Sequence, residues 1–436
     1  MFESVQKQAA KTPQRKVCHL HSNRSGNVAI IFALLLPVLI GFIGLSTDVA
    51  LWNWEDRKLQ ATTDSAALAA GYEMLSTSDN GVLQSRVNSE LQTAYPGSAS
   101  VALVSVTRPP TSGNFSGDSS AIEVVVSNQV GRYFSIMHAD ADVNLQKRAV
   151  AQITNNGGFC LLGLSQSLDK AVQFSGNSDI NLGCGIAVNS NSDQSLYVGG
   201  SATVTANPVS TVGKLRQIGS GEVISSGGVT ELAPPVVDPY AGLGIPTSPS
   251  SCTYNKHVSK GTKTLSPGRY CNGLKFQGGN ATLLPGTYII DGGDFRASGN
   301  ANIQGTGVTI ILTGSGNDYA NMDIQGGTSM TLSAPEAGSG GDYEGILIYQ
   351  DRDAPMYQGS QVISNKLNGG TDLDLRGAIY FPQQEIVFTG GANGTIECLQ
   401  IVAQQISFNG NAEISNNCSS DDAVQEIVQQ YVKLVE

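Results

Sequence analysis

The sequence predicts an α+β N-terminal module, a long membrane-spanning helix followed by a few antiparallel strands. An all-β, right-handed parallel β-helix-like solenoid and a C-terminal amphipathic helix follow. Three observations lead to this fold class: a charge-free apolar run, a recurring glycine-containing word, and six cysteines in three local pairs. The 436 residues include 51 glycines and only 14% charged residues, which is typical of many tight turns between short strands.

The apolar run occupies residues 28–51, and its first 18 residues, 28–45, carry no charge. As a helix, those 18 residues measure about 27 Å, close to the ~30 Å hydrocarbon core of a bilayer. Residues 1–27 hold five basic side chains and one acidic one, so we expect a cytoplasmic basic leader and an exported remainder. Trp52 and Trp54 follow where an outer interfacial belt would place them. A cleaved secretory signal, the alternative, has a shorter run and a nearby small-x-small cleavage site.

The charge balance limits the partners of the exported part. The chain has a formal net charge of −11, and its basic leader makes the rest more acidic still. Because nucleic acids and anionic lipid head groups attract basic surfaces, the sequence argues against both as partners.

Seven cysteines are present, and only Cys18 precedes the apolar run. The other six fall into local pairs separated by 24, 19 and 20 residues, as expected for disulfides in an oxidising compartment. Six cysteines allow fifteen pairings, so the local pairing is a hypothesis. A metal site is the alternative, but the sequence has no C-x-x-C spacing, and we expect neither metal nor cofactor. The predicted pairs are Cys160–Cys184, Cys252–Cys271 and Cys398–Cys418.

Residues 52–156 read as an α+β module. Helical spacing continues from the apolar run to about Leu75, and a second helical piece covers Gln84 to Leu91. Alternating patterns then predict strands at 101–106, 121–126 and 141–153, with a short helix or loop before the last one. Any small α+β subdomain fits this pattern.

Residues 24–72 carry an ordered set of motif residues around the apolar run. They are Arg24, Gly26, Asn27, Pro37, Asp48, Leu59, Gln60, Asp64, Ala66, Ala67, Leu68, Ala69 and Ala70. This set resembles the N-terminal module of TadE/TadG-like proteins of the Tad (Flp) pilus, a type IV-related system.

The resemblance implies that residues 52–156 are pilin-like and that the partners are other pilus subunits or assembly proteins. These would bind through the membrane helix and the helix that follows it. It also implies a single-pass protein of the inner (cytoplasmic) membrane, with the exported domain in the periplasm or on the surface pilus. Two features depart from the family: Ile31 stands where pilins of this class usually have glutamate, and no D-x-S-x-S metal motif is present.

A nine-residue word repeats beyond residue 157, with the form apolar-x-apolar-x-Gly, a small turn, then another apolar residue. Neighbouring copies are 20 to 27 residues apart, the length of one rung of a parallel β-helix. A β-sandwich of hairpins is the competing fold, but it does not need one repeated word. We therefore expect a glycine-rich solenoid over 157–418. The copies lie at 172–180, 196–204, 274–283, 295–303, 322–330, 386–396 and 406–414.

Two further segments complete the chain. The proline-rich insertion at 232–251 cannot be regular structure, so we expect it to lie along the solenoid surface. Residues 419–436 show an amphipathic helical pattern, and we expect that helix to cap an open end of the solenoid.

Catalysis on polysaccharides would need paired carboxylates, as in many secreted β-helix enzymes. We read the acidic residues as turn and ion-pair residues and expect no enzymatic activity. The function predicted is that of a minor or accessory, tip or assembly, component of a Tad-type pilus, with a surface or glycan ligand on the solenoid. A membrane-anchored glycan-active enzyme and a pilus-independent surface adhesin are the alternatives. The candidate catalytic residues would be Asp291, Asp294, Asp351, Arg352, Asp353 and Asp372.

Overall fold

The computed structural model describes residues 26–137, 141–247, 249–358, 361–368, 372–390, 393–396, 398–410, 413–416 and 427–436. The chain divides into two compact units. Unit 1 comprises the residues up to Gln152 together with Val432–Glu436, and unit 2 comprises Ile153–Tyr431.

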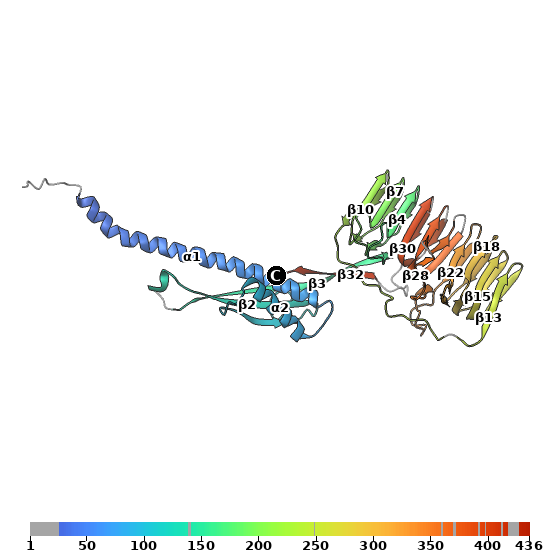
Figure 1. Ribbon diagram of the computed structural model, residues 1–436, viewed down its shortest axis with the longest axis horizontal. Helices are drawn as coiled ribbons and strands as arrows, with labels where there is room; N and C mark the ends of the chain where they lie inside the picture. The colour runs from blue at the N-terminus through green and yellow to red at the C-terminus, as the bar shows by residue number, and fades with distance from the viewer. Residues whose placement is uncertain are drawn as a thin grey trace, which may run out of the picture. The chain divides into compact units, whose positions relative to one another are not determined.

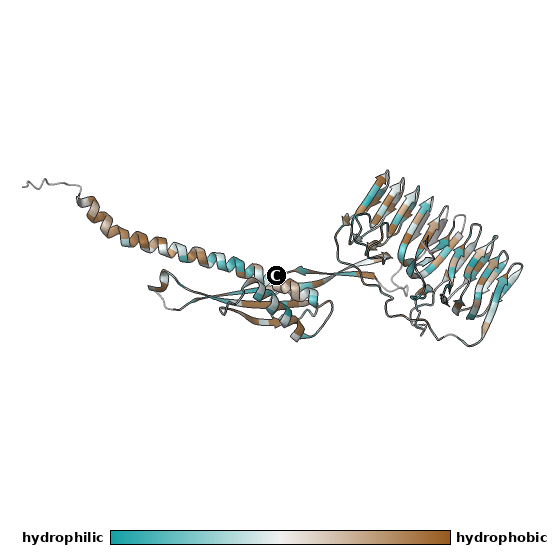
Figure 2. Cartoon of the chain, viewed as in Figure 1, coloured by the Kyte–Doolittle hydropathy of each residue, from teal (hydrophilic) through white to brown (hydrophobic). Residues whose placement is uncertain are grey.

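Helix α1 (Gly26–Glu73) is the main element of unit 1, a single helix of 48 residues that contains Pro37. Its first part is apolar along its whole circumference and exposed, as the brown colour in Figure 2 shows. Its second part buries a stripe of small and apolar side chains, including Leu59 and Ala66. The continuation of the membrane helix toward Leu75 is thus confirmed. Helix α2 (Asn80–Ala94) packs against α1 through Leu83, Val87 and Leu91.

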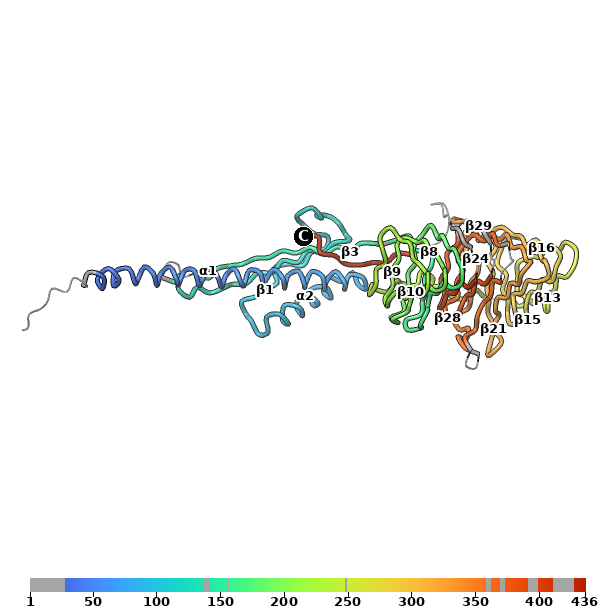
Figure 3. The backbone as a smooth tube through the Cα atoms, turned by 90° about the horizontal axis from the view of Figure 1, so that it is seen from above, coloured from blue at the N-terminus to red at the C-terminus, as the bar shows by residue number. Residues whose placement is uncertain are grey.

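Three antiparallel strands run beside these helices in unit 1 (Figure 3). They are β1 (Val101–Thr107), β2 (Ala121–Val130) and β3 (Val143–Gly163), paired in the order β1–β2–β3. A 3₁₀ turn, η1 (Ser135–Met137), lies between β2 and β3. The middle strand is buried along most of its length because β1 and β3 flank it and α1 packs against it.

Unit 2 is a solenoid-like stack of short parallel strands. Its first strands are β4 (Val172–Gly176), β5 (Asp179–Asn181), β6 (Gly185–Val188), β7 (Leu196–Gly200), β8 (Thr203–Thr205), β9 (Val209–Thr211), β10 (Leu215–Gly219), β11 (Glu222–Ile224) and β12 (Val229–Thr230). Later ones are β13 (Cys252–Val258), β14 (Thr262–Leu265), β15 (Gly268–Gln277), β16 (Asn280–Leu283), β17 (Gly286–Asp291), β18 (Asp294–Ser298), β19 (Asn302–Gly305), β20 (Val308–Ser315), β22 (Asn321–Ile324), β23 (Ser329–Ser333) and β24 (Ile346–Gln350). The last are β27 (Ser364–Leu367), β28 (Asp372–Thr389), β29 (Asn393–Ile396), β30 (Cys398–Gly410) and β31 (Glu413–Asn416).

The strands stack in three columns of parallel ladders. One column runs β13–β15–β18–β22–β27–β28–β30–β4–β7–β10. A second runs β14–β16–β19–β23–β28–β29–β31–β5–β8–β11. A third runs β13–β15–β17–β20–β24–β28–β30–β3–β6–β9–β12.

The rungs do not follow the order of the sequence. The chain begins the stack in its interior at β3 and winds outward to β12 at one end, and the rungs from β13 onward start at the other end. These later rungs wind back until β30 pairs with β3 and β4, so the late rungs lie beside the first ones. Figure 1 shows this order as green strands next to red ones, with yellow strands at the far end.

The proline-rich segment at 232–251 connects the two ends of the stack. It begins beside β9, where the Ala233 N–H bonds the Thr211 carbonyl at 3.0 Å, and it leads into β13. Along the way Tyr240 packs into a second core with Tyr349 and Tyr380. The expectation that this segment lies along the solenoid surface is confirmed, and we call residues 232–251 the strap.

The repeated words occupy the turns of the stack, where glycines face one another from rung to rung. Gly410, Gly176, Gly200 and Gly219 all have positive φ, between 76° and 87°. A Cβ on Gly176 would lie 2.7 Å from the backbone nitrogen of Gly410, so only glycine fits this column. Inside the stack, Phe174, Phe408 and Phe388 stack in sequence with centroids 5.0 and 4.7 Å apart.

The expected C-terminal amphipathic helix at 419–436 is wrong over the part that the structure describes. Residues 427–434 instead form strand β32 (Ile427–Leu434), which pairs with β3. Ile427 and Val432 are buried, but so is Gln429, whose amide bonds Ser210 and the Pro234 carbonyl. Because a neighbouring strand offers main-chain partners, the segment adopts the extended form despite its helical pattern. Residues 419–426 lie outside the described residues.

Candidate functional site

The exposed part of α1 is the first candidate surface. Residues 28–43 are exposed without interruption, although nearly all are apolar. The described residues include one helix long and apolar enough to cross a membrane, and this segment lies in it. Such a surface in water would be costly, whereas lipid would cover it at no cost. The exposed apolar segment of α1 is therefore consistent with a membrane anchor.

Asp48 lies just past this apolar segment and is fully buried. Its carboxylate accepts backbone N–H groups from the turn after β2: Ser135 at 2.7 Å, Phe134 at 3.0 Å and Tyr133 at 3.3 Å. Converging N–H donors can satisfy a carboxylate without a basic partner. The motif residue Asp48 therefore joins α1 to this turn.

Neighbouring contacts extend the junction along the helix. The Trp52 indole N–H is 3.4 Å from the Gly131 carbonyl, and the Arg132 guanidinium lies 5.2 Å from the Trp52 ring centroid. On the other side of Asp48, the Phe134 side chain packs against Gly44, where an added Cβ would lie only 2.8 Å away. The sequence indicated Trp52 as an interfacial residue but not its partners.

The later motif residues hold α1 against its own unit. Leu59, Ala66 and Ala67 are buried, and Leu68 is half-buried. The Gln60 amide donates to the Asp64 carboxylate at 2.6 Å and reaches the Arg148 carbonyl at 3.4 Å. Among the other motif positions, Gly26 and Asn27 begin α1, Pro37 lies within it, and Arg24 is outside the described residues.

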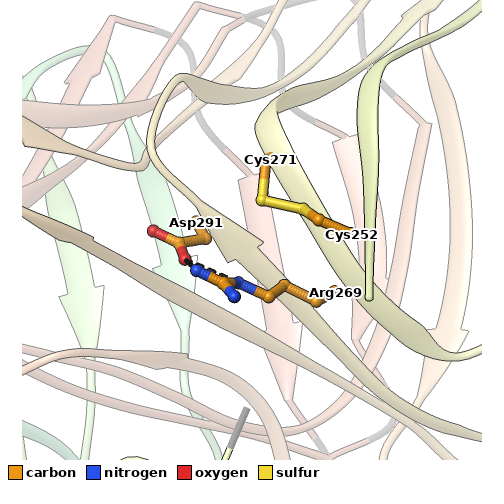
Figure 4. Close-up of a disulfide and its surroundings, with 4 residues drawn as sticks. All are labelled: Cys252, Arg269, Cys271 and Asp291. Atoms are coloured by element: carbon orange, nitrogen blue, oxygen red, sulfur yellow. Dashed lines mark hydrogen bonds and ion pairs between the residues drawn. A yellow bond between two sulfur atoms is a disulfide. The ribbon is translucent and has the colours of Figure 1, made fainter. Parts of the chain in front are cut away.

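Two of the three predicted disulfides are present in unit 2. Cys160 pairs with Cys184 and Cys252 with Cys271, with Cα atoms 5.8 and 6.0 Å apart. Figure 4 shows the second bridge, which joins β13 to β15 where the strap enters the stack. The third pair, Cys398–Cys418, stays a prediction because Cys418 lies outside the described residues.

The candidate catalytic residues are dispersed among structural contacts. Asp291 forms an ion pair with Arg269, whose Nε lies 2.7 Å from the carboxylate (Figure 4). Asp351 is buried and accepts the Thr313 hydroxyl at 2.6 Å, while Asp353 is exposed in the same turn.

The remaining candidates differ from one another. Arg352 turns toward the strap and pairs with Asp238 at 2.9 Å. Burial raises the pKa of Asp294, with Lys275 acting in the opposite direction. The backbone of Asp372 opens strand β28. Within the described residues, no group of three or more His, Cys, Asp and Glu side chains is placed to hold a metal ion.

The strap forms a groove with the solenoid that sequence reasoning missed. Its volume is about 640 Å³, and its wall includes Asn189, Asn191, Asp238 and Arg352. Tyrosine hydroxyls fasten the strap: Tyr349 donates to the Leu243 carbonyl at 2.7 Å, and Tyr380 donates to Asp238 at 2.8 Å. The prolines of residues 232–251 predicted an irregular segment there, but not its tyrosine partners, which lie on strands more than a hundred residues later.

Comparison with known proteins bears on α1 alone. Comparison with curated proteins and with solved structures gives no match. A family model described as "Putative Flp pilus-assembly TadE/G-like" matches residues 26–73, the same residues that form α1. The resemblance noted for residues 24–72 is thereby confirmed: the N-terminal helix of this chain is similar to the TadE/G-like Flp pilus-assembly family.

Proposed function

We propose that this protein is a minor or accessory component of a Tad-type pilus, at the tip or in assembly, with a structural or adhesive, non-catalytic role. The observation that carries the proposal is the coincidence of the TadE/G-like match with α1, a helix exposed over residues 28–43. A helix of this kind can pack lengthwise against the membrane helices of other pilus subunits.

The solenoid supports the display part of the proposal. Parallel ladders in three columns, winding one rung per repeat, fit a parallel β-helix. The helix would be right-handed, because parallel β-crossovers are nearly always right-handed. We propose that it is exposed outside the cytoplasmic membrane. The two disulfides fit an oxidising compartment. The strap groove, whose wall combines amide and charged side chains with apolar ones, is the surface we assign to a surface or glycan ligand.

An envelope enzyme acting on polysaccharide is the second candidate, and one observation favours it. Asp294 has a raised pKa caused by burial, as general acids in glycosidases do. The structural contacts of Asp291 and Asp351 weigh against a catalytic pair. Loss of a measured glycan-cleaving activity in Asp294→Asn, with the fold retained, would decide for the enzyme.

The proposal is tested by mass spectrometry of the native protein from membranes and from sheared surface filaments. A matched variant replaces residues 28–43 by a leucine-rich span of equal length and hydropathy, since these residues have little contact with the rest of unit 1. We expect the native protein in the filament fraction or bound to assembly proteins, and the variant in membranes without those partners. Equal association of both with pilus components would show that α1 is only an anchor, which would contradict the proposal.

A further inference from the structure

The turn between β2 and β3 carries apolar side chains that the described part of the protein leaves uncovered. Tyr133, Phe134 and Ile136 are 70%, 55% and 52% exposed. Single apolar residues on a surface are common, but three within four positions form a local patch. A patch of this kind marks contact with a membrane or with another protein.

The turn is held at a defined height along α1. Asp48 accepts N–H groups of residues 133–135, Gly44 leaves room for Phe134, and Trp52 reaches Gly131. The contacts on α1 extend from Gly44 to Trp52, a helical rise of about 12 Å. In Figure 3 the teal turn after β2 lies against the helix.

This height coincides with the end of the membrane-spanning run. Gly44 belongs to the charge-free residues 28–45, and the exposed side chains of Leu45 and Val49 lie on the same stretch of helix. The patch of the turn therefore continues the apolar surface that α1 presents to lipid.

Asp48 gives a second reason for the turn to accompany α1 into the interface. It is the first charged residue after the charge-free residues 28–45, and a bare carboxylate near the hydrocarbon region is costly. The N–H groups of the turn satisfy it and cover it completely. Arg132 over Trp52 adds two side chains typical of the headgroup region.

We propose that the turn at residues 131–137 is a second membrane contact, in which Tyr133, Phe134 and Ile136 insert into the outer interfacial layer of the lipid bilayer beside α1. The inference depends on α1 spanning the membrane. The contact couples unit 1 to the bilayer at a second point and thereby limits the tilt of the unit about its anchor.

The test is a depth measurement on the full chain in phosphatidylcholine liposomes. In a Cys18→Ser background, Ile136→Cys receives a nitroxide spin label, and its collisions with oxygen and with a water-soluble nickel chelate are compared. The unlabelled background checks that the remaining cysteines do not react. We expect oxygen collisions to dominate at position 136, as at a Leu39→Cys label inside the span. A Ser116→Cys label, in the loop at the opposite end of β2, should show the reverse ratio.

Each other outcome overturns the inference. Nickel access at position 136 equal to that at 116 would place the turn in water. Protection from both reagents would mean that a protein, such as a second copy of the chain, covers the patch. The Leu39→Cys label distinguishes the membrane-spanning role of α1 from the second contact at the turn. If the label at 39 reports lipid and the label at 136 reports water, α1 still spans the membrane but the turn does not contact it. Asp48→Ala should move the label at 136 toward water, whereas Thr47→Ala should leave it in place.

Discussion

The Asp48 carboxylate accepts the backbone N–H of Ser135 at 2.7 Å, across 87 residues of sequence. This bond links the end of the membrane-spanning run to the turn between β2 and β3. It gives a motif residue of the TadE/G-like helix a physical role: it closes the helix onto its own unit just past the charge-free residues 28–45.

Replacing Asp48 by alanine tests this role. Loss of the carboxylate leaves the N–H groups of residues 133–135 without an acceptor, so these amides should exchange with solvent at least about tenfold faster. Hydrogen-exchange mass spectrometry of the full chain in detergent measures the effect. Thr47→Ala, which removes only a bond to the Ile43 carbonyl within the helix, is the control. Unchanged exchange in Asp48→Ala would show that the carboxylate does not hold the turn.

Gly176 and Gly158 form a matched pair for the glycine column. Their φ values are 87° and 86°, but a Cβ on Gly176 meets the Gly410 backbone at 2.7 Å, whereas one on Gly158 meets no atom within 4 Å. Both alanine variants carry the cost of a left-handed residue, about 1–2 kcal/mol. Gly176→Ala should lower the free energy of unfolding of unit 2 by roughly 2 kcal/mol more. Equal losses by urea denaturation would refute the close approach of the rungs.

The Cys252–Cys271 bridge ties the strap's exit to the next rung. A disulfide between cysteines 19 residues apart stabilises by roughly 3 kcal/mol, because it restricts the unfolded chain. The double variant Cys252→Ser/Cys271→Ser should therefore have a lower melting temperature than the native protein. A reductant should lower the melting temperature of the double variant by less than it lowers that of the native protein. Peptide mapping without reduction also tests the third predicted pair, Cys398–Cys418. A melting temperature that the double variant leaves unchanged would contradict the bridge's stabilising role.

The strap should loosen when a tyrosine hydroxyl is removed. Tyr349→Phe deletes the bond to the Leu243 carbonyl, a loss of about 1 kcal/mol, and leaves that carbonyl less well satisfied. We expect faster proteolytic cleavage within residues 232–251 during limited digestion. Tyr254→Phe, at an exposed position of β13, is the control. If both variants resist cleavage like the native chain, the hydroxyl does not fasten the strap.

Stability of unit 1 should depend on pH through Arg148, whose Nε is 2.8 Å from Glu123 and whose Nη1 is 2.5 Å from Glu436. Burial alone would raise the pKa of Glu123, but hydrogen bonds from Arg148 and Ser112 and the Arg148 charge lower it overall. The Arg148 bond and the Asn114 N–H lower the pKa of Glu436. A carboxyl group whose pKa is lower in the folded protein than in the unfolded chain, where it is about 4.3, stabilises the folded state at pH values above the unfolded pKa. This stabilisation is lost as the pH falls through the folded pKa.

The measurement is hydrogen exchange in β2 and β3 between about pH 6 and pH 3, with rates corrected for intrinsic pH dependence. Protection should decline on acidification in the native chain, and Glu436→Gln should show a weaker decline. Glu90→Gln, which breaks only the surface pair with Arg86, should follow the native curve. If protection in Glu436→Gln declined with pH as steeply as in the native chain, Glu436 would not contribute to the pH dependence of stability.

Much of the architecture could be predicted because it depends on residues that are close together in the sequence. The uncharged run predicted the first part of α1, and the helical spacing after it predicted the continuation to about Leu75. The two disulfides that lie within the described residues follow from short separations, since each joins cysteines in adjacent rungs.

The partners of the charged side chains could not be predicted from local sequence patterns. Asp291 reads as a turn residue in the sequence, but its partner Arg269 lies one rung away and is found only by register. Arg352 stands between Asp351 and Asp353 in the sequence, but it pairs with Asp238 of the strap. Partners of this kind depend on which segments stack, and no spacing in the sequence gives that.

The sequence by itself predicted the apolar helix, the repeat, the strap and the two disulfides that the structure describes, because hydrophobic period, glycine turns, proline content and short cysteine separations act over a few residues. Tertiary structure alone decided the order of the rungs, the strand at 427–434 and the burial of Asp48 by residues 133–135. The physical reason is common to all three. Every copy of the glycine word offers similar main-chain partners, and an amphipathic or acidic segment takes its conformation from whichever distant backbone satisfies its hydrogen bonds.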